Sequence, residues 1–531
     1  MSPHSASQSF TGALATPHAL ATEAGMRAYR DGGNAIDAAI VAAAVLTVVY
    51  PHNVALGGDL IALVRTPDGE VRCVNASGWA GTAADAAGLR ARHGRWLPAR
   101  GADSVTVPGG VRGWEALRRF GARLTWDQTL QAAESTARDG VPVPPSLASH
   151  VADPENADLF GTEDFDRVFR STGLSLRVGD DFVQPALADT FAVLRQEGPD
   201  AFYQGGLAER SIGYLRSHGS SLTVEDFATF QPDTVEPISV DFHGLTVLTS
   251  PPNTHGFLLL RALRAVDELG ITDPLGDGLG VLLRVFHRGN ALRSSYLADP
   301  RYVSVDVAAL VNDGLDEMAE LGSAQPGPAL VPHGDTVGVA AADDDGYTVS
   351  LIQSVYHAFG SGLIDPVTGI LFHNRGTSFS LDDASPNVIA PRKRPAHTLM
   401  PVMTTHQRAP RHVLATMGGQ GQPQILAQVL LRALGGVGAE SAVAAPRAIV
   451  GLQVDGGTAD SVTVESDVRE AARASIGRAG LVRTDVAAHS ETLGQTNVVF
   501  ADAKGSMMAA SDPRSDGAAV VAHYPRFVKP N

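Results

Sequence analysis

Thr336 and Ser354 are two hydroxyl residues that the sequence predicts at the same end of a tight hairpin. Apolar residues alternate from 337 to 341 and again from 349 to 351, and Asp345-Gly346 between them is a strong turn signal. These features are typical of two antiparallel strands joined by a short loop. Two hydroxyl groups side by side at a strand end could form a nucleophile and a partner that orients it.

The length of the hairpin loop sets which residue faces Thr336. A two-residue loop at 344–345 puts residue 336 opposite 353, and a loop at 345–346 puts it opposite 355. Ser354 lies between those two positions, so either loop brings its hydroxyl next to that of Thr336. The residue pattern alone therefore predicts a contact between the two side chains.

A threonine inside a chain is a weak nucleophile, whereas a threonine at a chain terminus carries its own base. A free α-amino group has a pKa of about 7.7 to 8.0, so a useful fraction is neutral near pH 7 and can take the hydroxyl proton. A cut between Asp335 and Thr336 would therefore create a catalyst. An Asp-Thr dipeptide alone also fits an ordinary edge-strand residue, so the surrounding sequence has to decide.

Helical patterns dominate before Thr336 and extended patterns dominate after it. Apolar periodicity predicts helices over Phe257 to Leu269 and over Gly280 to Leu297. The apolar run from Ala38 to Tyr50 is too short to span a bilayer, so we interpret it as a buried core helix that Asn34 caps.

One segment has no usable periodicity. The stretch between Leu321 and Asp335 is rich in Gly, Pro and Ala, which predicts a mobile tether directly before the candidate cut. Such a tether suits a place where the chain must bend for cleavage and then move away.

Composition indicates a large globular protein that acts on small molecules. The 531 residues are 44% hydrophobic and 18% charged, enough for a sizeable core. A net charge of -16, with 41 basic residues spread along the chain, argues against nucleic acid as a partner. No segment predicts a membrane span. Cys73 is the only cysteine, which excludes an internal disulfide and a cysteine-based metal cluster and suggests a small buried hydrophobe.

Several blocks of the chain resemble the γ-glutamyltranspeptidase family, in the family's order. The first is GGNAIDAAIVAAAVLTVVYPHNVALGGD, from Gly32 to Asp59, and the hairpin segment from Gly334 to Gly362 is another. The remaining blocks are TVPGGVRGWEAL from Thr106, ARDGVPV from Ala137, SPPNTHG from Ser250, ADPRYV from Ala298, GILFHNRGTSFSL from Gly369, KRPAHTLMP from Lys393 and ATMGGQGQPQ from Ala415.

This resemblance implies a fold and a maturation route. Members form one α+β unit, a four-layer αββα sandwich of the N-terminal nucleophile hydrolase type, and cut themselves before the nucleophile. The cut would fall between Asp335 and Thr336, giving a large fragment, 1–335, and a small one, 336–531. Neither fragment should fold alone, so the two would form an obligate heterodimer, or a dimer of such heterodimers. No cofactor or metal is implied. The start of the chain lacks a secretory pattern, which suggests a cytoplasmic member.

The resemblance also assigns roles to the catalytic residues. Thr336 matches the family nucleophile and Ser354 matches a hydroxyl residue that hydrogen-bonds it. Gly418 and Gly419 match the family's oxyanion pair, where glycine lets two backbone N–H groups approach the substrate closely. A lone Gly-Gly pair would be a weak signal, but here it lies within MGGQGQPQ.

The substrate side departs from that of true γ-glutamyl enzymes. Their carboxylate-binding arginine corresponds to Ser77 or Gly78 here, and their acidic residue for the α-amino group corresponds to Ser378. Losing both charged partners should weaken glutathione recognition sharply.

Other residues of the substrate loops point to a different acyl group. Arg375 offers a planar fork for a carboxylate, although a surface salt bridge is an equally ordinary role for an arginine. His397 and Thr398 stand where the family often has paired serines, and Tyr356 and His357 lie in YHAFGSG. Either histidine could instead be a satisfied core residue. The pattern resembles the family's amidohydrolase branch, which cleaves a small amide next to a carboxylate, such as oxamate.

Alternatives from other classes remain. A γ-glutamyltransferase or glutathione hydrolase is the closest one, and an uncleaved, non-catalytic binding scaffold is another. Asp343-Asp344-Asp345 offers oxygen ligands for a metal, but consecutive turn residues seldom converge on one ion, so we interpret it as a solvated hairpin tip. No G-x-S-x-G elbow supports a serine hydrolase, and the glycines from Gly276 to Gly280 lack the preceding strand of a dinucleotide loop, so they indicate a turn.

Overall fold

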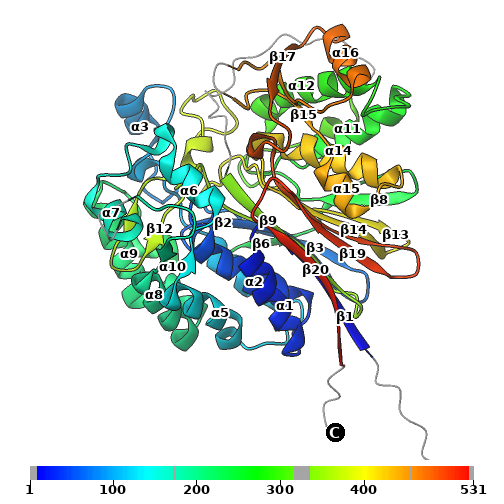
Figure 1. Cartoon of the computed structure of the whole chain (residues 1–531). Coiled ribbons are helices and arrows are strands. Elements are labelled where there is room, and N and C mark those ends of the chain that lie inside the picture. The colour runs from blue at the N-terminus through cyan, green and yellow to red at the C-terminus, as the bar shows by residue number, and fades with distance from the viewer. Residues whose placement is uncertain (1–8, 171–174, 316–334, 455–456, 526–531) are drawn as a thin grey trace, which may run out of the picture.

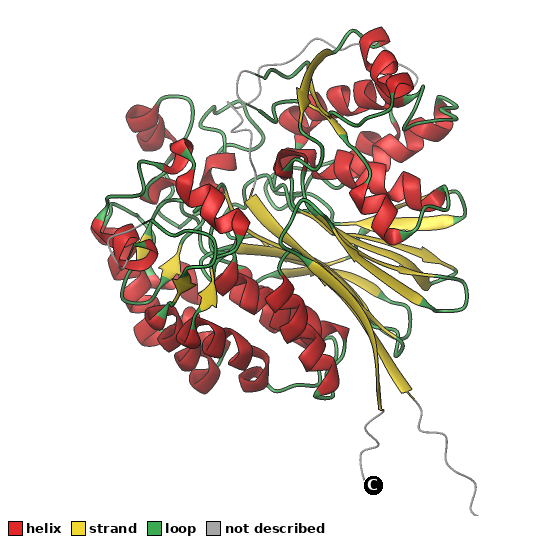
Figure 2. Ribbon diagram, viewed as in Figure 1, coloured by secondary structure: helices red, strands yellow, loops and turns green. Residues whose placement is uncertain are grey.

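Two β-sheets face each other at the centre of the computed structural model, and helices cover both outer faces (Figures 1 and 2). The structure describes residues 9–170, 175–315, 335–454 and 457–525. The first sheet has seven strands in the order β20 (Ala518–Pro525), β1 (Ser9–Thr16), β9 (Asp335–Asp343), β10 (Thr348–Tyr356), β2 (Asp59–Arg65), β3 (Val71–Ala76) and β6 (Asp233–Val235). The second has six, in the order β19 (Met507–Ser511), β18 (Thr496–Ala501), β14 (Ala409–Thr416), β13 (Val402–His406), β8 (Leu245–Thr249) and β7 (Ile238–Phe242).

Each sheet has its own helical layer. The first packs against α1 (Ala19–Arg30), α2 (Ala35–Val49), α4 (Gly110–Arg118), α5 (Trp126–Asp139) and α8 (Pro185–Glu197). The second packs against α11 (Phe257–Glu268), α12 (Leu279–Tyr296), α14 (Gln422–Leu434), α15 (Ala439–Ala444) and α16 (Glu470–Arg478). The predicted αββα sandwich is confirmed.

Smaller elements lie around this frame. The helices are α3 (Ala86–His93), α6 (Pro145–Ala152), α7 (Glu163–Phe169), α9 (Gly205–Ser217), α10 (Val224–Ala228) and α13 (Val307–Asn312). The strands are β4 (Val141–Pro142), β5 (Asp181–Phe182), β11 (Ile364–Asp365), β12 (Ile370–Leu371), β15 (Ala448–Val450), β16 (Ser461–Glu465) and β17 (Val482–Val486). None of the described helices is long and apolar enough to cross a membrane.

Small residues bring the two sheets close together behind the candidate nucleophile. A Cβ at Gly338 would lie only 2.7 Å from the carbonyl carbon of Ala415, so no larger residue fits there without moving the backbone. Cys73 and Ala340 belong to the same apolar layer between the sheets, and Cys73 is buried as expected. This contact holds β14, and the loop that follows it, against the start of β9.

Helix α2 supports the hairpin from the other side. All of its residues are buried, and it packs against β9 and β10. The Asn34 side chain accepts from the N–H of Ile36 and Asp37, and the Asp37 carboxylate accepts from the N–H of Asn34, which completes a capping box. The predictions of a core helix and of its cap are confirmed. The two other predicted helices, over Phe257 to Leu269 and over Gly280 to Leu297, are confirmed by α11 and α12.

Both sheets combine strands from the two sides of Asp335-Thr336. Strand β9 pairs with β1, and β10 pairs with β2, so the hairpin completes a sheet begun by the first part of the chain. In the second sheet, β13 pairs with β8 in the same way. The predicted tether between Leu321 and Asp335 lies outside the described residues, apart from Asp335 itself.

The hairpin loop is one residue longer than either expected loop. Ala342 pairs with Thr348, so three residues, Asp344 to Gly346, form the loop, and Gly346 has a φ of 96°. The two-residue loop was therefore the wrong prediction, because Gly346 takes the left-handed position of a longer turn. Val337 lies opposite Gln353, and the register then shifts so that Tyr356 lies opposite Asp335. Ser354 is the first residue of this irregular stretch on β10 and lies beside Thr336 on β9.

The hairpin tip is not simply solvated. Asp343 is buried, and its carboxylate accepts from the N–H of Ala35 at 2.8 Å and from that of Tyr347 at 3.0 Å. Burial raises its pKa to about 7. Asp345 pairs with Arg123 at 2.6 Å. The interpretation of a solvated tip was wrong for Asp343, since the tip docks on α2. Among the described residues, no group of three or more His, Cys, Asp or Glu could hold a metal ion.

Candidate active site

A chain of hydroxyl groups leads from Thr336 to the peptide bond that precedes it. The Thr336 Oγ1 donates to Ser354 Oγ at 3.0 Å, and Ser354 Oγ donates to the carbonyl oxygen of Asp335 at 2.5 Å. The N–H of Tyr356 donates to the same Ser354 oxygen at 2.8 Å, which fixes its orientation. Thr336 is 1% exposed. The geometry therefore joins the candidate nucleophile to the carbonyl that it would attack.

Tyr356 connects this hydroxyl chain to a buried arginine. Its backbone has a φ of 82°, a strained conformation for a residue with a side chain. The bulge turns the N–H of Tyr356 toward Ser354 and its ring toward Arg375, whose guanidinium carbon lies 3.7 Å from the ring centroid.

Arg375 is held in place by three of the residues that the sequence grouped with it. It begins the short 3₁₀ helix η5 (Arg375–Ser378) and is 1% exposed. Its Nη1 donates to Thr398 Oγ1 at 3.3 Å and to Ser378 Oγ at 3.4 Å, and its guanidinium lies over the ring of Tyr356. Burial lowers its pKa to about 10, so it stays charged at neutral pH. The surface salt bridge is therefore excluded.

His397 contacts Asp59 rather than Thr336. Its Nδ1 accepts from the N–H of Leu399, so the proton lies on Nε2, which donates to Asp59 Oδ2 at 3.1 Å. Burial and the nearby Arg375 lower the pKa of His397 to about 3, so it is neutral. His357 likewise has a local partner, because its Nδ1 lies 2.8 Å from Asn374 Nδ2.

Asp59 is a buried charge that the residue pattern did not single out. Its carboxylate also accepts from the N–H of Gly78 at 2.9 Å, and His373 lies 3.5 Å away. Although burial disfavours the charged form, His373 and His397 hold the pKa of Asp59 below its usual value. An aspartate after Gly-Gly, directly before the apolar run of residues 60–64, was the available signal.

The glycine pair follows β14 in a backbone conformation that other residues rarely adopt. Gly418 has a φ of 137° and Gly419 a φ of 49°, and Gly419 begins the 3₁₀ helix η6 (Gly419–Gly421) before α14. A Cβ at Gly418 would also lie 2.3 Å from Ile425 Cδ1. Gly418 and Asp335 line one cavity, which brings this loop to the candidate cleavage site.

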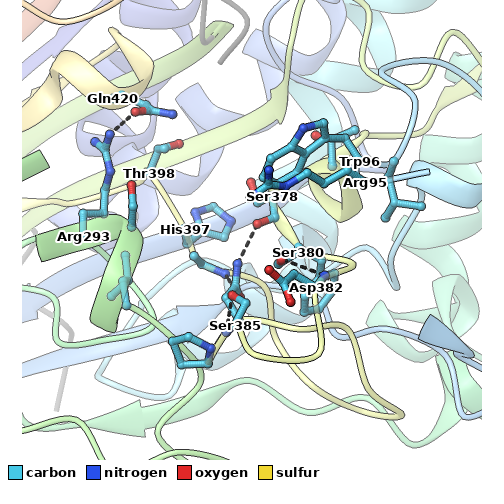
Figure 3. A pocket seen from close by; sticks show the side chains of 18 of the residues that line it. Arg95, Trp96, Arg293, Ser378, Ser380, Asp382, Ser385, His397, Thr398 and Gln420 are labelled. Carbon is cyan, nitrogen blue, oxygen red and sulfur yellow. Dashed lines mark hydrogen bonds between the residues drawn. The ribbon is translucent and has the colours of Figure 1, made fainter. Parts of the chain in front are cut away.

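Two cavities lie next to residues that contact the hydroxyl chain: Tyr356 lines the first, and Asp335 lines the second. The first, of about 650 Å³, is the one drawn in Figure 3, and the second, of about 500 Å³, contains Asp335. Residues lining the first include Arg293, Tyr356, Ser378, His397, Thr398 and Gln420. Residues lining the second include Arg100, His150, Asp335, His357, Gly418 and Glu491.

The second cavity contains an ionic contact to the residue before Thr336. His150 Nε2 lies 3.5 Å from Asp335 Oδ1. Burial works against a charged imidazole, but the carboxylates of Asp335 and Glu491 outweigh it and raise the pKa of His150 to about 9. Sequence reasoning missed His150, because it lies on α6, far from the hairpin along the chain.

Ser77 and Gly78, which correspond to the carboxylate-binding arginine of γ-glutamyl enzymes, have local structural roles here. Ser77 Oγ donates to Asn75 Oδ1 at 2.8 Å, and a Cβ at Gly78 would lie only 1.6 Å from the carbonyl oxygen of Val107. A long cationic side chain therefore cannot be accommodated at Gly78 in this backbone.

Comparisons with known proteins agree with this architecture. The gamma-glutamyltranspeptidase family model matches residues 21–522. The chain is 36% identical to an oxamate amidohydrolase proenzyme of Klebsiella pneumoniae, over 97% of this chain and 99% of that one. It is 33% identical to a glutathione hydrolase-like YwrD proenzyme of Bacillus subtilis, over 96% of this chain and 98% of that one.

A solved structure is similar over the same extent. The crystal structure of a cephalosporin acylase from Bacillus halodurans superposes with a TM-score of 0.88, at 31% identity, and covers 98% of each chain. Two sheets between helical layers, a nearly full-length family match and relatives that are amide-cleaving proenzymes have one explanation: this chain is an enzyme of the γ-glutamyltranspeptidase family, with the N-terminal nucleophile hydrolase fold.

Proposed function

We propose that the chain is a precursor that cuts itself before Thr336 and then hydrolyses a small amide next to a carboxylate, such as oxamate. The observation that carries the proposal is the hydrogen-bond chain from Thr336 through Ser354 to the carbonyl oxygen of Asp335. It supplies both a polarised carbonyl and a route for the hydroxyl proton, which is what an attack on that carbonyl requires.

Self-cleavage would proceed in two steps. The Thr336 oxygen bonds to the carbonyl carbon of Asp335 while its proton passes through Ser354 to the Thr336 nitrogen, and the C–N bond then breaks to give an ester and a free α-amino group. Water hydrolyses the ester, which leaves fragments 1–335 and 336–531. The short Ser354 contact to the Asp335 oxygen would stabilise the charge that develops there.

The mature enzyme would use the same oxygen on a substrate. The α-amino group of Thr336 takes the hydroxyl proton and passes it to the leaving amine, which departs as ammonia from a primary amide. Backbone N–H groups of Gly418 and Gly419 would hold the oxyanion, an interaction worth roughly 2.7 to 4 kcal/mol for each donor. Water then clears the acyl ester. Thr336, Ser354 and the two glycines suffice for these steps, and none uses a cofactor.

Arg375 favours a carboxylate-bearing acyl group. It is buried, charged and fixed over Tyr356, and Thr398 and Ser378 hold one edge of its guanidinium. A carboxylate placed against the remaining edge would lie near the hydroxyl chain, because the N–H of the same Tyr356 contacts Ser354. The name of the Klebsiella pneumoniae relative supports oxamate as the first substrate to test.

A γ-glutamyltransferase or glutathione hydrolase is the second candidate. The name of the Bacillus subtilis relative favours it. Ser77, Gly78 and Ser378 count against it, since they offer no charge for the carboxylate and ammonium groups of a γ-glutamyl substrate. A non-catalytic scaffold is a weaker candidate, because a binding protein has no need for a hydroxyl chain that ends on its own peptide carbonyl.

We also propose that the two fragments stay together after cleavage, in the cytoplasm. Both sheets draw strands from each fragment, so separating the fragments would expose the apolar layer between the sheets. Gel filtration of cleaved protein, with denaturing electrophoresis of the peak, tests the association. Fractionation of the producing cells tests the location.

Intact-mass measurement under denaturing conditions tests the proposal first. Wild-type protein should give two fragments beginning at Met1 and Thr336, and Thr336→Ala should remain one chain. Cleaved protein should then release ammonia from oxamate and little product from glutathione. An uncut wild-type chain would overturn self-processing, and cleaved protein that prefers γ-glutamyl amides would favour the second candidate.

A further inference from the structure

Arg293 lines the first cavity and is a cation that the proposed chemistry does not use. Arg293 lies on α12, and Figure 3 shows its side chain reaching toward Gln420, to whose Oε1 its Nη2 donates. Its Nη1 is shielded from solvent and has no hydrogen-bond partner among the described residues. Burial lowers its pKa to about 10, which still leaves it charged at neutral pH.

Arg375 likewise has a guanidinium nitrogen without a hydrogen-bond partner among the described residues. Its Nη1 donates to the hydroxyl groups of Thr398 and Ser378. Its Nη2 is buried and, in the described part of the chain, has no hydrogen-bond partner. Neither Arg293 nor Arg375 has an acidic side chain within ion-pair distance in that part of the chain. Both guanidinium groups therefore keep donors left over. The Asp59 carboxylate acts electrostatically on Arg375 from beyond ion-pair distance, whereas no carboxylate of the described residues balances Arg293.

Such an arrangement favours anionic ligands. A guanidinium held away from water without a counter-ion carries a desolvation penalty, and a carboxylate that accepts from both edges of the fork relieves it. Tyr356 lines the cavity together with Arg293, and the guanidinium of Arg375 lies against the ring of Tyr356, so Arg375 borders the cavity from behind this wall. Gln420, the partner of Arg293, follows Gly419 directly, which places Arg293 on the side of the glycine pair.

We infer that this cavity binds two carboxylates at once, and hence that the substrate is a dianionic amide. Arg375 would take the carboxylate next to the reacting carbonyl, and Arg293 a second carboxylate at the other end of the molecule. This inference rests on the proposed function only in taking the bound dianion to be a substrate. The binding of a dianion by the two arginines stands apart from the chemistry at Thr336.

Calorimetric titration tests the binding directly. Malonate and succinate are compared with acetate and propionate at constant ionic strength, on the purified full-length protein. The two dicarboxylates should bind at least tenfold more tightly than the two monocarboxylates. Equal affinities in wild-type protein would overturn the inference whatever any variant does, because one carboxylate would then satisfy both arginines.

Two variants locate the effect. Arg293→Gln should reduce the preference for dicarboxylates about tenfold and change monocarboxylate binding less than threefold. Arg95→Gln is the matched control, since Arg95 lines the same cavity but is exposed, and it should leave the preference intact. Equal losses in both variants would point to the general positive charge of the cavity and overturn the assignment to Arg293.

Turnover separates this inference from the proposed function. Cleaved wild-type enzyme should hydrolyse N-oxalylglycine, a dianion, with a kcat/KM at least tenfold above that for oxamate, and Arg293→Gln should lose this advantage through KM. Hydrolysis of oxamate alone would uphold the proposed function and overturn the inference. Tight dicarboxylate binding by a chain that never cuts itself would uphold the two-carboxylate cavity and overturn the proposed function.

Discussion

The hairpin end and the wall of the first cavity are built in opposite ways. Thr336 and Ser354 lie 18 residues apart on paired strands, so backbone register alone brings their hydroxyl groups together. Arg293 and Gln420 lie 127 residues apart, on helix α12 and in the short helix η6 after β14. Sheet register tolerates little change, whereas the side chains that helices and loops present to a cavity can be exchanged more freely. The comparison teaches that this fold can keep one reaction while its substrate contacts change.

The largest expected effect is at the candidate nucleophile, Thr336. Thr336→Ala should abolish both self-cleavage and amide hydrolysis, because neither reaction has another oxygen at this position. Thr336→Ser keeps a hydroxyl and should still cut, more slowly. Denaturing mass spectra of both variants provide the measurement. Cleavage at the usual position in the alanine variant would mean that the hairpin does not carry the reaction.

Ser354→Ala comes next, with an expected slowing of self-cleavage by about 10²-fold, the usual contribution of a positioned proton-transfer group. The variant loses the contact to the Asp335 carbonyl but leaves Thr336 in place. The time course of cleavage after synthesis measures the effect.

Ser350→Ala is the matched control on the same strand. Its hydroxyl donates to the carbonyl oxygen of Leu414 at 2.7 Å, away from the cut, so this variant should cut at nearly the wild-type rate. Similar slowing in both variants would indicate loss of sheet stability rather than loss of a proton route.

Arg375→Lys should act on the substrate and spare the hairpin. Lysine keeps the charge but loses the planar fork, so we expect KM for oxamate to rise about tenfold with a smaller change in kcat. Initial rates of ammonia release, measured on fully cleaved protein, give both constants. A variant that binds oxamate normally but no longer cuts itself would break the proposed division between the two regions.

The smallest effect concerns pH and the second cavity. The pKa of His150 is raised in the fold, to about 9, so its pair with Asp335 stabilises the uncut chain fully below about pH 6.5, and this stability is lost as the pH rises through 9. The contribution is up to about 3 kcal/mol. Urea unfolding of the Thr336→Ala chain at pH 6 and pH 9.5 measures it.

The double variant Thr336→Ala/His150→Gln isolates the contribution of the His150–Asp335 pair to the free energy of unfolding. Asp343 also has a raised pKa and lowers stability as the pH rises, so the single variant alone does not identify the group. The difference between the two unfolding curves should shrink from pH 6 to pH 9.5. A constant difference would mean that the His150 contact does not titrate.

The residue pattern predicted most of the local structure that surrounds the candidate nucleophile. Asn34, the buried run of α2 and the contact of Thr336 with Ser354 all follow from short-range spacing. The loop length was wrong by one residue, since a glycine after two aspartates fits two turn types and only the docking of Asp343 on α2 selects the longer one.

Residues that meet from distant segments were harder to predict. Arg375, Thr398 and Ser378 were grouped correctly because family blocks aligned them, yet the contact of His397 with Asp59 was not foreseen. His150 and Arg293 had no local signal at all. Each is an ordinary helical residue by sequence, and its partner is determined by how a whole helix packs.

The sequence by itself determined the contact between Thr336 and Ser354, because strand alternation is a property of neighbouring residues, and its resemblance to the family indicated the sandwich. Only the tertiary structure decided which charges face the site. A buried arginine such as Arg375 or Arg293 acquires its role from the groups that surround it, and those groups come from segments brought together only when the two sheets and their helices pack.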